Sequence, residues 1–268
     1  LSLLKEMWVF TFFIFLNQII DQINWSVDKF LLGRFAGTTA VAVYGVGGQI
    51  NTLYLQFSSS VSNVFVPKVN RIVAETNDND QLTKLFTKVG RIQFMVLGLI
   101  LSGFIFFGVP FVKIWAGTEY GASYAVALLL IIPVTVPLIQ NLGIEIQRAK
   151  NMHKARAVVY LAIAIANIFI SIPLIKLMGP AGAALGTLIA ETVVLIVQLI
   201  VLRDWIRDLF SEVQWVKACV STAVAGVACY GVKALNLSNF IALVISVCVF
   251  GAVYAVLLLI MREPLFLE

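Results

Sequence analysis

The stretch FMVLGLILSGFIFFGVPFV, residues 94–112, contains no charged side chain over 19 consecutive positions. The hydrocarbon core of a bilayer is about 30 Å thick, which a helix of roughly 20 apolar residues crosses. Lipid offers the peptide backbone no hydrogen-bond partners, so a single segment crosses it as a helix that satisfies its own backbone groups. The stretch therefore predicts a membrane-spanning helix, and with its flanks we place this span at 86–112.

Seven further stretches have the same length and apolar character, separated by turns such as the polar run 75–80 and the Gly179-Pro180 pair. The sequence thus predicts an all-α polytopic membrane protein with eight transmembrane helices. The predicted spans are 7–32, 39–67, 86–112, 122–147, 156–176, 180–202, 215–234 and 239–261.

The overall composition supports this class. Hydrophobic residues make up 60% of the chain and charged residues 12%, whereas a soluble domain has about 25% charged residues. The single histidine, His153, has no acidic or thiol partner at ligand spacing, and the three cysteines lack a CxxC pair, so we expect neither a metal site nor a cofactor. The formal net charge of +5 is explained below by membrane topology, and nucleic acid is not an expected partner.

The basic residues indicate the orientation of the spans. If the eight spans alternate, 14 of the 19 Lys and Arg residues fall on one side of the membrane and five on the other. Loops rich in Lys and Arg stay on the cytoplasmic side. We therefore expect a multi-pass protein of the bacterial cytoplasmic (inner) membrane with both ends of this segment in the cytoplasm.

The spans divide into two groups. Residues 203–214 place Trp205, Ile206 and Leu209 on one helical face and charged residues on the other, which predicts an amphipathic helix in the cytoplasmic interface. The sequence therefore predicts a six-helix lobe over 1–202, an interfacial helix over 203–214, and a two-helix appendage over 215–268.

The first predicted span carries a wide polar stripe. Its acids and carboxamides recur at helical spacing. A helix that turns a carboxylate toward lipid loses about 2.5 to 3.5 kcal/mol of insertion free energy, so the stripe is not expected to face lipid. Asp21 lies near mid-membrane by residue count. We favour a water-filled substrate cavity over the alternative that the acids are paired with cations inside a packed bundle. The stripe and its neighbouring column contain Asn17, Gln18, Asp21, Gln22, Asn24, Asp28 and Lys29.

The second predicted span has a similar polar face. Gln49, Asn51 and Gln56 are its larger members and are assigned to the same cavity, while its Gly and Ser residues are also explained by close helix packing. In the sixth span Glu191 falls at mid-membrane and is a candidate for ion coupling. The alternative is that Glu191 has no function in transport and contacts Asn167, which lies at similar depth in the fifth span, so that each satisfies the other.

Two features of the fourth span concern its shape and its end. Pro133 and Pro137 remove two backbone hydrogen bonds and predict a bend near the middle of the helix. Glu145 and Arg148 are three residues apart, which favours a surface ion pair over a functional one.

Several of these residues carry a resemblance to a known family. The motifs are Asp28-Lys29-Phe30-Leu31-Leu32-Gly33, Val41–Tyr44, Gln147–Lys150, Asn167–Leu174 and Gly179–Thr187. The chain resembles the C-terminal half of bacterial polysaccharide-biosynthesis flippases of the Wzx type, within the multidrug/oligosaccharidyl-lipid/polysaccharide exporter superfamily. In such proteins two six-helix lobes face each other around a central cavity, so the resemblance implies that an N-terminal lobe of the same protein is missing from this chain.

The resemblance implies a transporter rather than an enzyme. The expected substrate is a polyprenyl-pyrophosphate-linked oligosaccharide, moved from the cytoplasmic to the outer leaflet for surface polysaccharide or lipopolysaccharide biosynthesis by ion-coupled alternating access. On this view Lys29 and Arg34 attract the pyrophosphate, and Asp21 and Glu191 couple transport to an ion gradient.

Other functions remain as alternatives. A drug/cation antiporter of the same superfamily would favour an aromatic and acidic cavity, and a flippase for the peptidoglycan lipid precursor would favour more cations deep in the cleft. A membrane glycosyltransferase or ligase acting on lipid-linked sugars would need a base or metal site in a sizeable loop. A structural membrane scaffold would not need a polar stripe along two spans.

Overall fold

The structure is a computed structural model that describes residues 8, 11, 12, 15, 26–149, 153–201, 220–227 and 239–260. Every element within these ranges is helical. Residues 26–35 form the end of a first helix, and 220–227 form a short helical segment. The longer elements are α2 (Thr38–Glu75), α3 (Asn79–Trp115), the 3-10 turn η1 (Thr118–Tyr120), α4 (Ser123–Ile139), α5 (Asn141–Ala149), α6 (His153–Met178), α7 (Pro180–Val201) and α10 (Asn239–Ile260).

These helices agree with six of the predicted spans, and the spans at 7–32 and 215–234 are described only in part. Among the described residues, α3 and the stretch Pro180–Ile200 of α7 are long and apolar enough to cross a bilayer, and the bent pair α4 and α5 makes a third candidate. Carboxamides such as Gln49 and Gln56 lower the hydropathy of α2. The helical membrane fold is therefore supported, while the count of eight spans stays a prediction.

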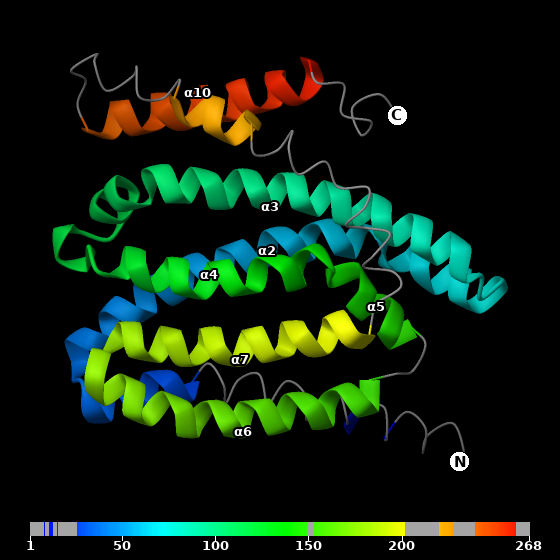
Figure 1. The fold of residues 1–268 in the computed structure, drawn as a ribbon, viewed down its shortest axis with the longest axis horizontal. Coiled ribbons are helices and arrows are strands. Elements are labelled where there is room, and N and C mark those ends of the chain that lie inside the picture. The colour runs from blue at the N-terminus through cyan, green and yellow to red at the C-terminus, as the bar shows by residue number, and fades with distance from the viewer. Residues whose placement is uncertain are drawn as a thin grey trace.

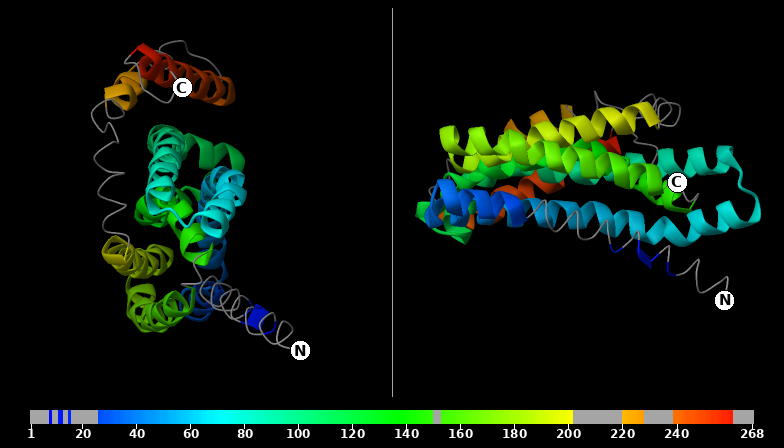
Figure 2. Two further views of the ribbon diagram at one scale, coloured as in Figure 1. Left: turned by 90° about the vertical axis from the view of Figure 1, so that its right-hand side faces the viewer. Right: turned by 90° about the horizontal axis from the view of Figure 1, so that it is seen from below.

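The helices lie roughly side by side in layers (Figures 1 and 2). α4 is central, because it contacts α2, α3 and α7, and α6 packs on the far side of α7. α10 contacts α3 and forms a separate layer beyond it. The division into a six-helix lobe and a two-helix appendage stays a prediction. The interfacial helix predicted at 203–214 lies outside the described residues, and the domain boundaries stay predictions.

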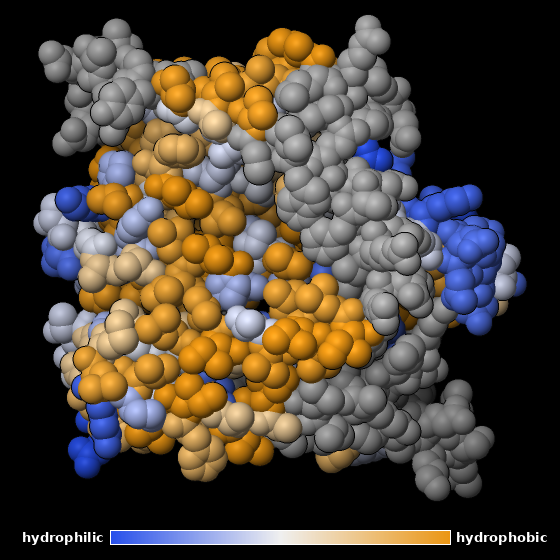
Figure 3. Space-filling view, in the orientation of Figure 1, coloured by the Kyte–Doolittle hydropathy of each residue, from blue (hydrophilic) through white to orange (hydrophobic). Residues whose placement is uncertain are grey.

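Two apolar cores hold the lobe together. The larger core joins α2, α3, α4 and α5 and contains the fully buried Tyr54, Phe86, Leu97 and Leu142. The second joins the 26–35 helix to α2, α4, α6 and α7 around Leu32, Ile175 and Ala183, among others. On the face seen in Figure 3, the described residues form a mostly apolar area in the middle, with hydrophilic residues at the left and right edges. This distribution is typical of a protein embedded in a bilayer.

The α2–α3 hairpin projects beyond the other helices at one end of the molecule (Figure 1). Both helices extend past the predicted spans of 39–67 and 86–112, and only Thr76, Asn77 and Asp78 separate them. Asn77 turns the chain with a positive φ of 47°, and Asp78 begins α3 as its N-cap. This hairpin carries the basic residues Lys68, Arg71, Lys84, Lys88 and Arg91. Arg148 lies in the last turn of α5, a helix that contacts both α2 and α3, so we call this the basic end of the lobe.

The N-cap at Asp78 predicts a pH effect on stability. Its Oδ1 atom accepts the backbone N–H of Asp80 at 2.8 Å, and its Oδ2 atom accepts the side-chain amide of Gln81 at 2.9 Å. These bonds, led by the one from Asp80, lower the pKa of Asp78 below its ordinary value of 3.8. Because the folded state has the lower pKa, the stabilisation is fully present above pH 3.8 and is lost as pH falls through the lowered value.

The variant Asp78→Asn keeps a capping oxygen but cannot ionise. We expect wild type to unfold at a higher temperature than the variant near neutral pH, and the difference to shrink in acid below pH 3.8. Thermal unfolding of the purified protein across this pH range measures the effect. A difference between the two proteins that stays constant into acid would contradict the assignment.

The predicted bend of the fourth span is present, but it lies nearer the end of the helix. α4 continues through both prolines to Ile139, and α5 then departs at an angle of 51°. The N–H of Gln140 bonds to the carbonyl of Pro137, three residues back, which tightens the last turn and ends α4. The predicted ion pair between Glu145 and Arg148 is confirmed at 2.7 Å, with the arginine exposed on α5.

A buried polar cluster fixes the bend against α2 and α3. The Gln93 amide is fully buried on α3 and donates to the Ser58 carbonyl at 3.1 Å and to the Ser62 hydroxyl at 2.7 Å. The Ser58 hydroxyl in turn donates to the carbonyl of Leu138 at 2.9 Å. Leu138 is thereby held just before the break, so the angle between α4 and α5 is set by side chains of other helices.

α6 and α7 form a tight hairpin. Gly179 makes the turn with a φ of 58°, and a Cβ atom added to Gly182 would overlap the carbonyl of Leu174. Glycine at position 182 therefore allows the two backbones to touch, as in other membrane helix pairs that meet through small residues.

Replacing Gly182 by alanine should force the two helices apart. We expect Gly182→Ala to lower the free energy of unfolding by about 1 to 3 kcal/mol, the usual effect of overpacking a core. Gly251→Ala is the matched control, because a Cβ atom there meets no atom within 4 Å. Unfolding in detergent measures both variants, and equal stabilities would contradict the close contact at Gly182.

Candidate functional site

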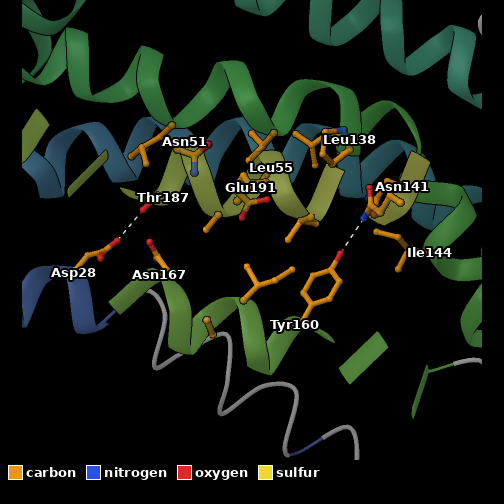
Figure 4. A pocket seen from close by; sticks show the side chains of 18 of the residues that line it. Asp28, Asn51, Leu55, Leu138, Asn141, Ile144, Tyr160, Asn167, Thr187 and Glu191 are labelled. Atoms are coloured by element: carbon orange, nitrogen blue, oxygen red, sulfur yellow. Dashed lines mark hydrogen bonds between the residues drawn. The ribbon is translucent and has the colours of Figure 1, made fainter. Parts of the chain in front are cut away.

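The lobe has a partly open cavity of about 240 Å³ whose lining includes several polar side chains, which we call the internal cavity. It lies between the 26–35 helix, α2, α4, α5, α6 and α7 (Figure 4). Its polar lining comprises Asp28, Tyr44, Asn51, Asn141, Tyr160, Asn167, Thr187, Glu191 and Gln198. The remaining walls are apolar side chains such as Leu55, Leu130 and Val194.

Asp28 lies at one end of this cavity and is only 4% exposed. The Tyr44 hydroxyl on α2 and the Thr187 hydroxyl on α7 each donate a hydrogen bond of 2.9 Å to its Oδ2 atom. A buried carboxylate is costly unless hydrogen bonds or a positive charge replace its water. Two hydroxyls from different helices supply that replacement, so Asp28 connects the first helix to α2 and α7.

Further oxygen atoms gather at the same end. Figure 4 shows Asn167 beside Asp28 and Thr187. The Oδ1 atom of Asn167 accepts the Ser171 hydroxyl at 3.1 Å, and Gly186 allows α7 to approach this pair closely. Carboxylate, amide and hydroxyl oxygens are ligands that hard cations prefer. No cluster of three or more His, Cys, Asp or Glu residues occurs in the described parts of the chain.

Tyr160 and Gln198 line the other end of the cavity. The Gln198 amide donates to the Tyr160 hydroxyl at 2.9 Å, and Asn141 lies close by (Figure 4). Glu191 lies between the two ends of the cavity. Asn51 reaches the cavity from the buried face of α2, and its Oδ1 atom is buried without a hydrogen-bond partner.

A second polar feature runs along the opposite face of α2. Its residues recur at helical spacing and are exposed, whereas Asn51, Tyr54, Ser58 and Ser62 on the other face are buried. We call this exposed set the α2 polar face. It consists of Gln49, Thr52, Gln56, Ser60 and Asn63. These side chains point away from the core of this lobe.

The predicted site residues separate into three groups. Asp28, Asn51 and Glu191 line the internal cavity, and Gln49 and Gln56 belong to the α2 polar face. Lys29 and Arg34 are exposed at the surface and do not line the cavity. The other predicted residues, Asn17, Gln18, Asp21, Gln22 and Asn24, lie outside the described residues. The roles given to all of them stay predictions.

Sequence reasoning missed several cavity residues. Tyr44, Tyr160, Thr187 and Gln198 were not singled out, although Thr187, Glu191 and Gln198 repeat at i, i+4 and i+11 and could have been found as a stripe on α7. Tyr44 has no such signal, because its partner Asp28 lies on another helix.

A larger cavity of about 520 Å³ lies between α2, α3, α4 and α10. Its lining is almost wholly apolar and includes Phe57, Phe104, Phe107 and Phe250. Among the described residues that line it, none is Asp, Glu, Lys, Arg or His, and its one hydroxyl, that of Tyr54, bonds to the Leu97 carbonyl and to Thr135.

Comparisons with known proteins agree with the resemblance seen in the sequence. A family model described as "Polysaccharide biosynthesis protein" matches residues 1–125. A protein named "Probable flippase AglR", from Haloferax volcanii, is 23% identical over 172 residues, which is 62% of this chain. These matches support a polysaccharide-biosynthesis flippase family.

One solved structure has a fold similar to that of this chain. The "Lipid II flippase MurJ, inward closed conformation" superposes with a TM-score of 0.73 over 94% of this chain, at 17% sequence identity. At this identity the likeness shows the fold alone. The chain spans 35% of the AglR relative and 53% of the MurJ chain, so it corresponds to only part of each protein.

The hydrogen bond from Tyr44 to Asp28 should contribute measurably to stability. We expect Tyr44→Phe to reduce the free energy of unfolding by about 1 to 2 kcal/mol, since bonds to carboxylates are strong but membrane helices show weaker effects than soluble proteins. In an Asp28→Asn background the loss should be about half as large, because the acceptor is then neutral.

Unfolding of the four proteins of this double-mutant cycle gives the coupling between the two residues. Tyr120→Phe is the control, because the Tyr120 hydroxyl makes no such bond to a carboxylate and its loss should change little. An equal effect of Tyr44→Phe in both backgrounds would show that the bond contributes no coupling.

Proposed function

We propose that this chain is one lobe of a membrane flippase that moves a lipid-linked, polyprenyl-pyrophosphate oligosaccharide from the cytoplasmic to the outer leaflet by ion-coupled alternating access. The observation that carries the proposal is the α2 polar face. Its side chains are exposed on a helix whose predicted span crosses the bilayer. Polar groups at membrane depth are tolerated where they line a water-filled cavity or contact another part of the protein.

The chemistry of this face suits a glycan. Gln49 and Gln56 each offer an amide donor and a carbonyl acceptor, and Thr52 and Ser60 offer hydroxyls, which together match the hydroxyl groups of sugars. The face has no acidic member, which favours a sugar over a cationic drug. We infer that a second lobe of the same protein closes over it, because the chain spans only part of its relatives.

Charged residues at the surface are the basis on which we orient the proposed substrate path across the membrane. Lys29 and Arg34 are exposed, where they can attract a pyrophosphate on the outer side. The basic end is placed in the cytoplasm by the positive-inside rule. For ion coupling we favour Asp28 together with Glu191, because both line the internal cavity and Asp28 contacts both α2 and α7.

The α2 polar face can be tested in the full-length protein that contains this chain. Replacing Gln49 and Gln56 together by leucine removes two carboxamides, each giving about 0.5 to 1.5 kcal/mol in hydrogen bonds, so export should slow roughly 5- to 150-fold. Surface polymer in a strain that depends on this gene measures export, at matched protein levels.

Val64→Ile is the matched control, because Val64 is an exposed apolar residue of the same helix. It should leave export unchanged, and the double replacement of Gln49 and Gln56 by asparagine should retain part of it. Normal export by the leucine variant would refute the proposed substrate face.

A further inference from the structure

The α2 polar face continues beyond the predicted span of 39–67 into the basic end of the lobe. α2 runs past the end of that span without a break to Glu75, within the hairpin that projects from the molecule (Figure 1). Arg71 is exposed, and it follows Ser60 by 11 residues, which is about three helical turns, so the two lie on nearly one line along α2. The face that begins with Gln49 therefore ends at an arginine.

The position of Arg71 along α2 sets its depth in the membrane. Arg71 lies four residues beyond the end of the predicted span at residue 67, which corresponds to about 6 Å of helix. The headgroup layers add several ångströms to each side of the hydrocarbon core. We therefore expect the Arg71 side chain at the level of the headgroups of the cytoplasmic leaflet. A pyrophosphate whose polyprenyl tail lies in that leaflet is at the same level.

The other basic residues of the hairpin lie away from this line. Lys68 follows Ser60 by eight residues, which turns it about 80° around the helix. On α3 the buried core residues, such as Phe86, face α2, so the basic residues of α3 lie on the far side of the hairpin. They are Lys84, Lys88 and Arg91. Arg71 alone among the basic residues of the hairpin continues the α2 polar face.

The Arg71 guanidinium is available to a ligand. Among the described residues its side chain makes no hydrogen bond or ion pair, even with Glu75 four residues further along. A guanidinium presents its N–H donors in a planar fork that matches pairs of phosphate oxygens. From Thr38 to Pro67, by contrast, α2 has no charged side chain. An anionic headgroup is therefore attracted to the end of the α2 polar face and meets only neutral groups along it.

We propose that Arg71 is the site at which the pyrophosphate of the lipid-linked oligosaccharide first binds, at the cytoplasmic end of the α2 polar face. The inference deepens the proposed function and rests on it. Lys29 and Arg34 are assigned to the outer side, so the substrate path has cations at both ends. Between them the neutral carboxamides and hydroxyls of α2 contact the sugars, and the pyrophosphate is not trapped midway.

Binding can be measured with the full-length protein in nanodiscs of phosphatidylcholine. The probe is undecaprenyl pyrophosphate, which carries the tail and the diphosphate without a sugar, and phosphatidylglycerol is the comparison lipid. Arg71→Ala removes the proposed site. Lys68→Ala is the matched control, because it removes the same charge from an exposed position of the same helix at the same end. It thereby accounts for any effect of charge on the orientation of the protein in the membrane.

We expect Arg71→Ala to weaken the binding of undecaprenyl pyrophosphate roughly 5- to 20-fold, because paired charge-assisted hydrogen bonds are lost at a hydrated site. Arg71→Lys should recover only part of the affinity, since an ammonium group has the charge without the fork. Lys68→Ala should bind the probe as wild type does, and the two alanine variants should bind phosphatidylglycerol equally.

Several outcomes would overturn the proposal. Unchanged affinity in Arg71→Ala would remove the site. Equal weakening in Lys68→Ala, or full recovery in Arg71→Lys, would show that only the net charge of the basic end matters. A loss of phosphatidylglycerol binding as large as the loss of probe binding would make Arg71 a general contact for lipid phosphates.

Inorganic pyrophosphate distinguishes the lipid headgroup from a free diphosphate. If Arg71 serves a lipid substrate, inorganic pyrophosphate should compete with the probe only weakly, because it has no tail in the bilayer. Competition by inorganic pyrophosphate at concentrations equal to that of the probe would identify a site for a soluble ligand and refute the assignment.

The probe contains no sugar, so its binding is separate from the export test. Binding that is insensitive to Arg71, together with export that depends on Gln49 and Gln56, refutes the Arg71 site alone. Binding that depends on Arg71, together with normal export by the leucine variant, refutes the substrate face alone.

Discussion

A carboxyl group buried inside a helix bundle must have its water replaced by protein groups, and this requirement at Asp28 organises the lobe. The Tyr44 and Thr187 hydroxyls that meet it lie 16 and 159 residues away along the chain. Three helices are therefore positioned relative to one another by hydrogen bonds to one oxygen atom. Any change in the state of that oxygen acts on all three, which is the physical basis for coupling an ion to a movement of the lobe.

The position of α2 explains how one helix serves two purposes. Its buried face supplies Tyr44 and Asn51 to the internal cavity and Tyr54 to the larger core, while its other face presents Gln49 and Gln56 outward. The bend between α4 and α5, where Gln93 and Ser58 contact each other, lies beside Asn141, which lines the cavity.

The sequence predicted the features that depend on local pattern. Six of the predicted spans are helical, because apolar length acts within one segment. Pro133 and Pro137 indicated a bend in the fourth span, but the break comes after both prolines, where contacts with α2 and α3 hold Leu138. The sequence also placed Asp28, Asn51 and Glu191 among the candidate residues. It did not separate the inward-facing Asn51 from the outward-facing Gln49 and Gln56, because the side of a helix that is covered depends on its neighbours. The Tyr44–Asp28 and Tyr160–Gln198 pairs join different helices and carry no signal in a single sequence.

The contact between α6 and α7 at Gly182 has a consequence for how motion in this lobe is observed. Two helices whose backbones touch at Gly182, with a second close approach at Gly186 to side chains of α6, cannot slide past each other without breaking these contacts. The distance between α6 and α7 is therefore expected to stay constant and can serve as an internal reference distance. Spectroscopic labels placed one on each of these helices should keep a constant separation throughout a working cycle, and changes measured from either helix to α2 can be calibrated against it.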